Sequence, residues 1–432
     1  MPSETKVSAS LTIDHKPHAA FFRQSGWYMI ATVVSGVFSF GLHFLNKKIS
    51  DGDYAIFVTL LTLVSCVPTI PLQMVFTQQS AEALAMNRER QLAGMIRLAW
   101  LWTGVLWLVG FVAVLIFQGN IVRRWQLPDS LGLWLTMPAV LVSLWMPLFS
   151  GVLQGRQDFF WLGWALILSG AARMAVAAAM VFFISHTANG LMIGVLGGIA
   201  VAATIGIWRT RDLWSKPPEP FEVKASLGKI VPLMLGFGAS QFMFASDTMF
   251  AKAFFSNEAM KPYGVAGTLS RALLWLVMPL AAVMFPKLVH SHAKSEKSNL
   301  FSIVVIGTGV LTACGAFGLW LVGPLVVKFV YKSSDVSAAV ALLPWYGGAM
   351  IPLGLANVLV NDLLARSRFG VVPAMLVLAV LYGLTLVFML HRFPGRLEVV
   401  LQTLAAFNTL LLGVCAWFRW GIKSANPNSQ ET

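Results

Sequence analysis

Residues Asp247 to Leu288 read DTMFAKAFFSNEAMKPYGVAGTLSRALLWLVMPLAAVMFPKL. The stretch joins two consecutive apolar segments, and each segment is long enough to cross the hydrocarbon core of a bilayer, which takes about 20 residues. Within them lie an acid and a base, Asp247 and Arg271. Ionisable side chains at membrane depth are costly, so they normally face a protein interior or a wet cavity. The stretch therefore predicts a polytopic helical protein with a polar site inside its membrane region.

The composition extends this prediction to the whole chain. Of its 432 residues, 57% are hydrophobic and only 11% are charged, whereas soluble domains are about a quarter charged. Apolar runs use nearly all of the length. We therefore expect an all-α polytopic membrane protein with twelve transmembrane helices in two six-helix lobes, and no soluble catalytic domain.

One polar break divides the chain. The residues RTRDLWSKPPEPFEVKAS, which begin at Arg209, combine charges with three prolines and are typical of a linker. The expected parts are a cytoplasmic tail (1–24), an N-terminal lobe (25–208), a cytoplasmic linker (209–229), a C-terminal lobe (230–418) and a second cytoplasmic tail (419–432). Residues 49–76 align with 255–285, and this local match indicates parallel repeats.

Basic residues set the expected orientation. Most of the 31 Lys and Arg residues fall in loops on the same side as the N-terminus. Short cytoplasmic loops of membrane proteins carry such an excess. The bias predicts that both termini are cytoplasmic and that the number of spans is even.

The depths of Asp247 and Arg271 match. Each lies about eight residues from the outer end of its span, roughly 12 Å below the surface at 1.5 Å per residue. Neighbouring antiparallel helices would let them pair, which lowers the cost of both charges. Two interpretations stay open: a structural salt bridge, or a charge pair that lines the translocation cavity and that a substrate anion or a proton could break. Trp275, one turn beyond Arg271, is expected to stack on the guanidinium.

Arg173 is the deepest charge in the sequence. It lies about halfway along its span, among the small residues Ser169, Gly170 and Ala177. Such surroundings face other helices or a cavity rather than lipid, and a guanidinium suits bidentate phosphate recognition. We predict that Arg173 lines a substrate-binding cavity; pairing with a distant carboxylate or with carbonyl groups is the alternative.

Other polar residues are candidates for coupling or gating, together with Asp247. Lys252 and Arg23 lie near span ends, where their long side chains can also reach the interface. Asn357 shares one side of the tenth span with Asn361 and Asp362. These three could line the cytoplasmic mouth of a cavity, although a solvated helix end is the simpler interpretation.

No motif indicates an enzyme. The sequence has no GxxxxGK[ST], GxSxG or HExxH pattern, and its cysteines (Cys66, Cys314 and Cys415) are far apart without metal-binding spacing. We expect no catalytic residue, no metal site, no cofactor and no nucleic-acid partner.

Several residues carry a family likeness. The pattern is Asp247 in span seven, an outer turn that ends near Tyr263-Gly264, and a helix that closes on Phe285-Pro286; the first pair of spans has Asp51-Gly52-Asp53-Tyr54 in its outer turn. In these features the chain resembles the polysaccharide flippases (Wzx-like) of the MOP (multidrug/oligosaccharidyl-lipid/polysaccharide) exporter superfamily. The segment FTQQSAEA at the end of span two departs from the resemblance, since many relatives carry a basic residue there.

The resemblance implies a function. It implies two lobes around a central cationic cavity and, by alternating access, translocation of an oligosaccharide linked to polyprenyl pyrophosphate to the outer leaflet of the bacterial cytoplasmic (inner) membrane. Arg173 and Arg271 would contact phosphates or an acidic sugar, and Asp247 would tune Arg271 or carry a coupling proton. A polysaccharide polymerase and glycosyltransferases are the partners expected in addition to the lipid-linked substrate and the bilayer.

Two alternatives stay open. One is a proton- or ion-coupled MATE-type antiporter of small molecules. The other is a non-transporting membrane component of an exopolysaccharide secretion complex.

Overall fold

The computed structural model describes residues 16–421 apart from 43–44, 46–47, 66, 125–129, 185, 221, 256, 295–299 and 331–335. The described part is helical and contains no strand, as predicted. Cys66 and most of the two predicted tails lie outside the described residues.

The helices follow one another along the chain with short connections. The first half contains α1 (Lys16–Gly41), α2 (Asp51–Ser65), α3 (Thr69–Ala85), α4 (Glu89–Arg124), α5 (Leu131–Gly155), α6 (Phe159–Phe183) and α7 (Ala188–Arg209). The second contains α8 (Arg211–Ser215), α9 (Val223–Phe254), α10 (Asn257–Ala293), α11 (Leu300–Val330), α12 (Val336–Ala365), α13 (Val371–Arg392) and α14 (Leu397–Ala416), which continues into a π-helical turn (Trp417–Gly421).

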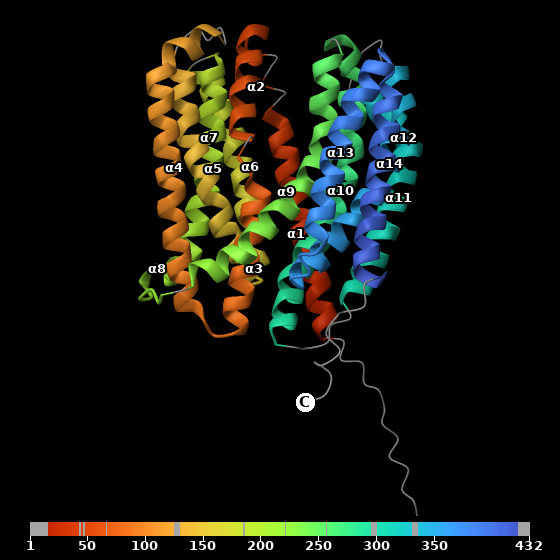
Figure 1. Ribbon diagram of the computed structural model, residues 1–432. Coiled ribbons are helices and arrows are strands. Elements are labelled where there is room, and N and C mark those ends of the chain that lie inside the picture. Colours follow the sequence, from red (N-terminus) through yellow and green to blue (C-terminus); the bar gives the residue numbers. More distant parts are fainter. Residues whose placement is uncertain are drawn as a thin grey trace, which may run out of the picture.

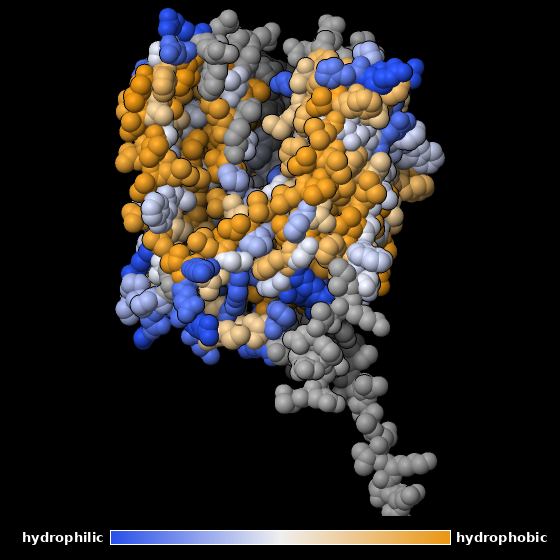
Figure 2. All heavy atoms as spheres, viewed as in Figure 1, coloured by the Kyte–Doolittle hydropathy of each residue, from blue (hydrophilic) through white to orange (hydrophobic). Residues whose placement is uncertain are grey.

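Eleven helical segments in the described part are long and apolar enough to cross a membrane, and α2 with α3 forms one of them. The predicted twelfth span is α1, which is not among the eleven because polar residues such as Arg23 and Gln24 occupy its first turns. Hydrophobic side chains form a broad band on the visible face, and hydrophilic ones gather at its two ends (Figure 2). The chain is therefore a multi-pass membrane protein.

The helices form two lobes (Figure 1). In the N-terminal lobe α6 packs on α1 and α7, and α5 packs on α3 and α7; in the C-terminal lobe α12 packs on α10, α11 and α14. Between the lobes, α1 and α3 contact α10, and α3 also contacts α9. We call the end of the molecule that carries α8 the linker end, and the opposite end, where the ribbons of the two lobes separate, the far end (Figure 1).

Glycines bring α5 and α3 close together. A Cβ atom added at Gly151 would lie 2.5 Å from the carbonyl oxygen of Gln73, and one added at Gly155 would lie 2.7 Å from that of Thr77. Small residues allow such close backbone approach in membrane helices, where van der Waals packing has to replace the hydrophobic effect between helices. The close approach places Gln73 and Gln154 side by side.

The linker is more ordered than the sequence indicates. The predicted range 209–229 contains the short helix α8 and the first turns of α9. Arg156 donates two hydrogen bonds to the Asp212 carboxylate, of 2.9 and 2.6 Å, and Arg97 donates to the carbonyl oxygens of Trp214 and Lys216. The hydrogen bonds from Arg156 lower the pKa of Asp212. These contacts hold the linker against the N-terminal lobe.

The end of α12 is buried rather than solvated, so the simpler interpretation of Asp362 was wrong. Its side chain is fully buried and forms ion pairs with Arg366 at 2.8 Å and Arg419 at 2.7 Å. The Arg419 guanidinium also lies 4.9 Å from the ring centre of Phe301. Burial, followed by the charges of Arg419 and Arg366, lowers the pKa of the nearby Arg368. The helical turn that carries Arg419 belongs to this cluster, so the predicted tail starts later than residue 419.

We predict that Asp362→Asn destabilises the C-terminal lobe. The substitution leaves two guanidinium groups beside a neutral amide, and removal of one partner from a buried ion pair costs about 3–5 kcal/mol. Thermal unfolding of the purified protein in detergent measures the effect. Glu398→Gln, at an exposed position, is the matched control, and equal melting temperatures for the two variants would contradict the prediction.

Candidate functional site

A cavity of about 210 Å³ lies between the two lobes. Helices α1, α3 and α5 form one wall, and α9, α10 and α12 form the other. The lining residues are Tyr28, Thr32, Ile70, Gln73, Met74, Gln154, Phe237, Ser240, Gln241, Phe244, Leu274, Trp275, Met278, Pro279, Ala281, Ala282, Leu353, Asn357 and Asn361. The molecular surface is hollowed between the lobes toward the far end (Figure 2).

The cavity wall is uncharged. Its polar groups are mainly amides, and none of the described lining residues is ionisable except Tyr28. Gln73 donates a hydrogen bond of 2.8 Å to Gln154, and Gln154 donates one of 2.9 Å to the carbonyl oxygen of Ala282 in the other lobe. The resemblance implied a cationic cavity, whereas the described lining of this cavity is neutral. An amide side chain, that of Gln154, forms a hydrogen bond from one wall to the other.

Asp247 is the centre of a buried polar network. Its carboxylate is fully buried, accepts 2.7 and 2.6 Å hydrogen bonds from Tyr263 and Arg271, and accepts another from Tyr346. Arg271 also donates to the Thr248 hydroxyl at 2.8 Å. The expected pairing of Asp247 with Arg271 is therefore confirmed. These hydrogen bonds join α9, α10 and α12 around one buried carboxylate.

The aromatic neighbours of Arg271 are not the expected ones. Its guanidinium carbon lies 5.5 Å from the ring centre of Phe244 and 5.6 Å from that of Tyr346. The prediction that Trp275 stacks on it was wrong, because Trp275 lines the cavity and is 40% exposed. Arg271 precedes Trp275 by one helical turn, so the ion pair lies beside the cavity toward the far end. This geometry favours the structural interpretation of the pair.

Arg173 packs against a neighbouring helix. A Cβ atom added at Gly198 of α7 would lie 2.7 Å from the Arg173 Cβ, and one added at Gly194 would lie 2.8 Å from its carbonyl oxygen. The buried Nε atom of Arg173 makes no hydrogen bond within the described part of the chain. Arg173 is not among the residues that line the cavity. In this conformation the structure brings it together with neither Asp247 nor Arg271.

The remaining candidates separate into two groups. Arg23 and Lys252 are exposed on α1 and α9 and do not line the cavity. Asn357 does line it, and its carbonyl oxygen accepts a 2.7 Å hydrogen bond from Asn361. Sequence reasoning missed Gln154 and Tyr346, whose partners come from distant parts of the chain.

Polar contacts close the linker end of the cavity. They join the lobes through Gln154 and Ala282 at 2.9 Å, Gln157 and Lys287 at 3.0 Å, Gln78 and Ser367 at 3.4 Å, and Glu82 and Lys229 at 2.5 Å. Gln78 and Glu82 belong to FTQQSAEA, the segment that departed from the resemblance. In this segment the structure shows an acid, Glu82, that pairs with a base of the other lobe.

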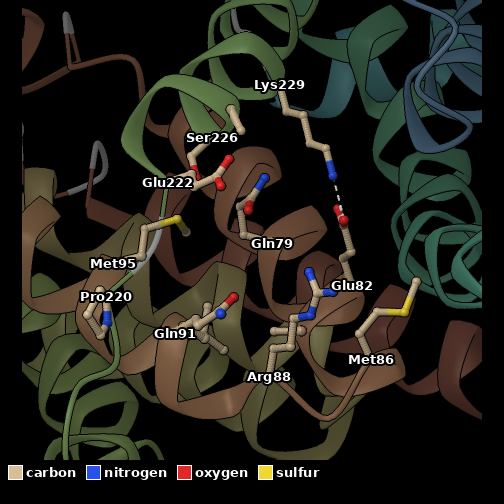
Figure 3. Close-up of a pocket in the computed structure, with 13 residues that line it drawn as sticks. Gln79, Glu82, Met86, Arg88, Gln91, Met95, Pro220, Glu222, Ser226 and Lys229 are labelled. Carbon is tan, nitrogen blue, oxygen red and sulfur yellow. Dashed lines mark hydrogen bonds and ion pairs between the residues drawn. The ribbon is translucent and has the colours of Figure 1, made fainter.

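A second, more polar pocket of about 550 Å³ lies at this end, between α3, α4, the linker and α9. Glu82 and Lys229 face one another beside it (Figure 3). The side chain of Glu82 is 27% exposed and that of Lys229 is 41% exposed. The contact between the lobes is therefore reached by water, which makes it easier to break than the Asp247 network.

Solved structures show the class of fold. An outward-facing multidrug resistance MATE family transporter of the MOP superfamily aligns with a TM-score of 0.76 at 13% identity. A MATE protein in a straight conformation aligns with a TM-score of 0.79 at 12% identity. A MOP superfamily transporter from Pyrococcus furiosus aligns with a TM-score of 0.76 at 12% identity. Each alignment covers 93% of this chain and 95% of the other. The fold is that of the MATE transporters of the MOP superfamily, as predicted.

The family is more specific. The family model described as lipid II flippase MurJ matches residues 71–416, so this chain belongs to the MurJ family. No curated protein sequence matches it. Membership confirms the predicted superfamily and a flippase family, while the closer likeness to Wzx-like polysaccharide flippases stays a prediction.

We predict that Glu82→Lys opens the linker end. The variant places two cations where an ion pair joined the lobes, so Ser240→Cys in the cavity should react faster with an impermeant maleimide added from the linker end. The native cysteines are replaced in this background. Glu219→Lys, which breaks the Arg90 pair without separating the lobes, should leave the rate unchanged, and the Glu82→Lys/Lys229→Glu exchange should restore slow labelling. Equal labelling in all of these proteins would show that the ion pair does not close this end.

We also predict strong energetic coupling between Asp247 and Arg271. Asp247→Asn leaves the guanidinium without its buried partner, at a cost of about 3–5 kcal/mol. The double variant Asp247→Asn/Arg271→Met should therefore lose much less unfolding free energy than the two single variants lose in sum. Unfolding in detergent measures the coupling energy. Asp247→Asn/Arg173→Met is the control and should be additive; additivity in the first pair as well would contradict the network.

Proposed function

We propose that this chain is a flippase that moves a lipid-linked oligosaccharide, carried on polyprenyl pyrophosphate, from the cytoplasmic to the outer leaflet. The observation that carries the proposal is a cavity between two lobes, closed at one end by polar contacts, in a chain of the MurJ family. A head group with many hydroxyls cannot cross hydrocarbon without losing its hydrogen bonds to water. A polar cavity replaces those hydrogen bonds while the lipid tail remains in the bilayer.

The contacts at the linker end suit a reversible opening. A neutral hydrogen bond contributes about 0.5–1.5 kcal/mol net, and an exposed ion pair about 0.2–1 kcal/mol. Three of the four polar contacts that join the lobes are of these two kinds, and the fourth, from Lys287 to Gln157, has a charged donor and contributes about 1.5–3 kcal/mol. Together these polar contacts contribute several kcal/mol. A carrier that alternates between two conformations needs such a small difference between them. Within the lobes, in contrast, helices are held by close packing at glycines in the N-terminal lobe and by ion pairs of buried carboxylates in the C-terminal lobe.

The direction of transport follows from the expected orientation. The excess of basic residues predicts that the linker end is cytoplasmic, so the described conformation is closed toward the cytoplasm. We propose the bacterial cytoplasmic membrane as the location, with a polysaccharide polymerase and glycosyltransferases as partners that consume and supply the substrate.

The cavity does not favour a MATE-type antiporter of cationic molecules. Such an antiporter needs a carboxylate that binds the cation or the coupling proton, and the described lining residues include none. Asp247, which was a candidate for coupling, is fully buried and already accepts hydrogen bonds from three side chains. A flippase of neutral and polar head groups fits these walls better.

We predict that locking the linker end stops transport. Cysteines at Glu82 and Lys229, in a background without native cysteines, are joined by a short bis-maleimide in proteoliposomes that contain a fluorescent polyprenyl pyrophosphate-linked disaccharide. Flipping, measured by quenching of the label in the outer leaflet, should fall to the protein-free rate. Modification of the same protein with a mono-maleimide is the control. A protein that flips no lipid before cross-linking, or as much afterwards, would contradict the proposed function.

A further inference from the structure

We infer that the cavity between the lobes selects the uncharged part of a glycan, and that sugars bearing a carboxylate are rejected there. The inference rests on the proposed function and narrows its substrate class. It replaces the expectation that arginines in the cavity bind an acidic sugar.

Neither arginine predicted to bind the substrate offers a free charge to the described cavity lining. Asp247 lies 2.6 Å from Arg271, and Arg173 packs on α7 outside the lining. An anion that entered would lose hydration without gaining a counter-charge from the described lining residues, and an uncompensated charge in a site of low dielectric is strongly disfavoured. The same reasoning places the pyrophosphate of the carrier outside this cavity in the described conformation.

Uncharged hydrogen-bonding groups are available in the cavity. The side chains of Ser240 and Gln241, on α9, are half-buried and make no hydrogen bond to any residue that the structure describes. Asn357, on the facing side of α12, accepts a 3.3 Å hydrogen bond from Asn361 through its side-chain oxygen, which leaves its amide nitrogen to donate. Hydroxyls and amides both donate and accept. A sugar hydroxyl also does both, so these groups match a neutral glycan.

Aromatic rings provide the second element of recognition. Trp275, 40% exposed, and Phe244 line the cavity next to these polar groups. Their ring faces carry partial negative charge, which attracts the polarised C–H face of a sugar ring and repels a carboxylate. The aromatic surface therefore favours neutral sugars over acidic ones, as does the lack of a counter-charge in the described lining.

The size of the cavity limits what is selected. Its volume of about 210 Å³ is below the roughly 300–1,000 Å³ of sites that enclose a drug-sized ligand. It accommodates a small part of a glycan rather than a whole oligosaccharide. Selection by charge therefore applies to the sugar that occupies the cavity, and not to the length of the chain.

Binding of two soluble probes tests the inference. Maltotriose and trigalacturonic acid have the same number of rings, and only the second bears carboxylates. Calorimetry on the purified protein should show that maltotriose binds at least tenfold more tightly. Gln241→Ala should weaken maltotriose binding severalfold, whereas Gln402→Ala, at an exposed position on α14, should not. Gln241→Lys should shift the preference toward trigalacturonic acid, since it adds the counter-charge that the cavity lacks.

Equal or tighter binding of trigalacturonic acid by the unmodified protein, or no binding of maltotriose, would overturn the inference. A second measurement separates it from the proposed function. Proteoliposomes with two lipid-linked disaccharides, one neutral and one containing a uronic acid, should flip the neutral lipid faster. Equal flipping of both overturns the selectivity and leaves the proposed function intact. Selective maltotriose binding without any flipping overturns the proposed function and leaves the selectivity intact.

Discussion

A carboxylate buried among membrane helices has to find its hydrogen-bond donors on other helices, and the arrangement of the C-terminal lobe depends on this constraint. Asp247 of α9 finds them in Tyr263 and Arg271 of α10 and in Tyr346 of α12. Water is absent from the hydrocarbon core, so a donor that is lost there is not replaced. The network fixes the three helices that form one wall of the cavity, and it balances the charge of Arg271 before any substrate arrives.

The strength of the contacts divides the molecule into rigid and movable parts. Within the C-terminal lobe, the carboxylates of Asp247 and Asp362 are fully buried in ion pairs. Within the N-terminal lobe, glycines of α5 and α7 let backbones approach at distances that no larger residue allows. Between the lobes there are hydrogen bonds, one of them from the charged Lys287, the partly exposed Glu82–Lys229 pair, and an apolar cluster with members in both lobes. Relative movement of the lobes therefore leaves the buried ion pairs within the C-terminal lobe intact.

Fold and substrate are decided at different places in this protein. The architecture is shared with MATE transporters at only 12–13% identity, and a common fold supports many functions. The residues that face the cavity belong to both lobes, and their amide and aromatic side chains form a neutral site. The same backbone with carboxylates or unpaired arginines at these positions would favour other substrates. The side chains of the cavity, rather than the helices that hold them, determine the chemistry of transport.

The sequence by itself determined the helical membrane fold, the division at the linker and the pairing of Asp247 with Arg271. These follow from apolar length, from proline and charge, and from depth along a helix, which are local properties. Only the tertiary structure decided that Tyr346, 99 residues away, completes the network, that Phe244 rather than Trp275 lies beside Arg271, and that Arg173 packs on α7. Helical periodicity shows which residues share a face. It does not show which helix that face meets, because packing between distant segments selects the partner.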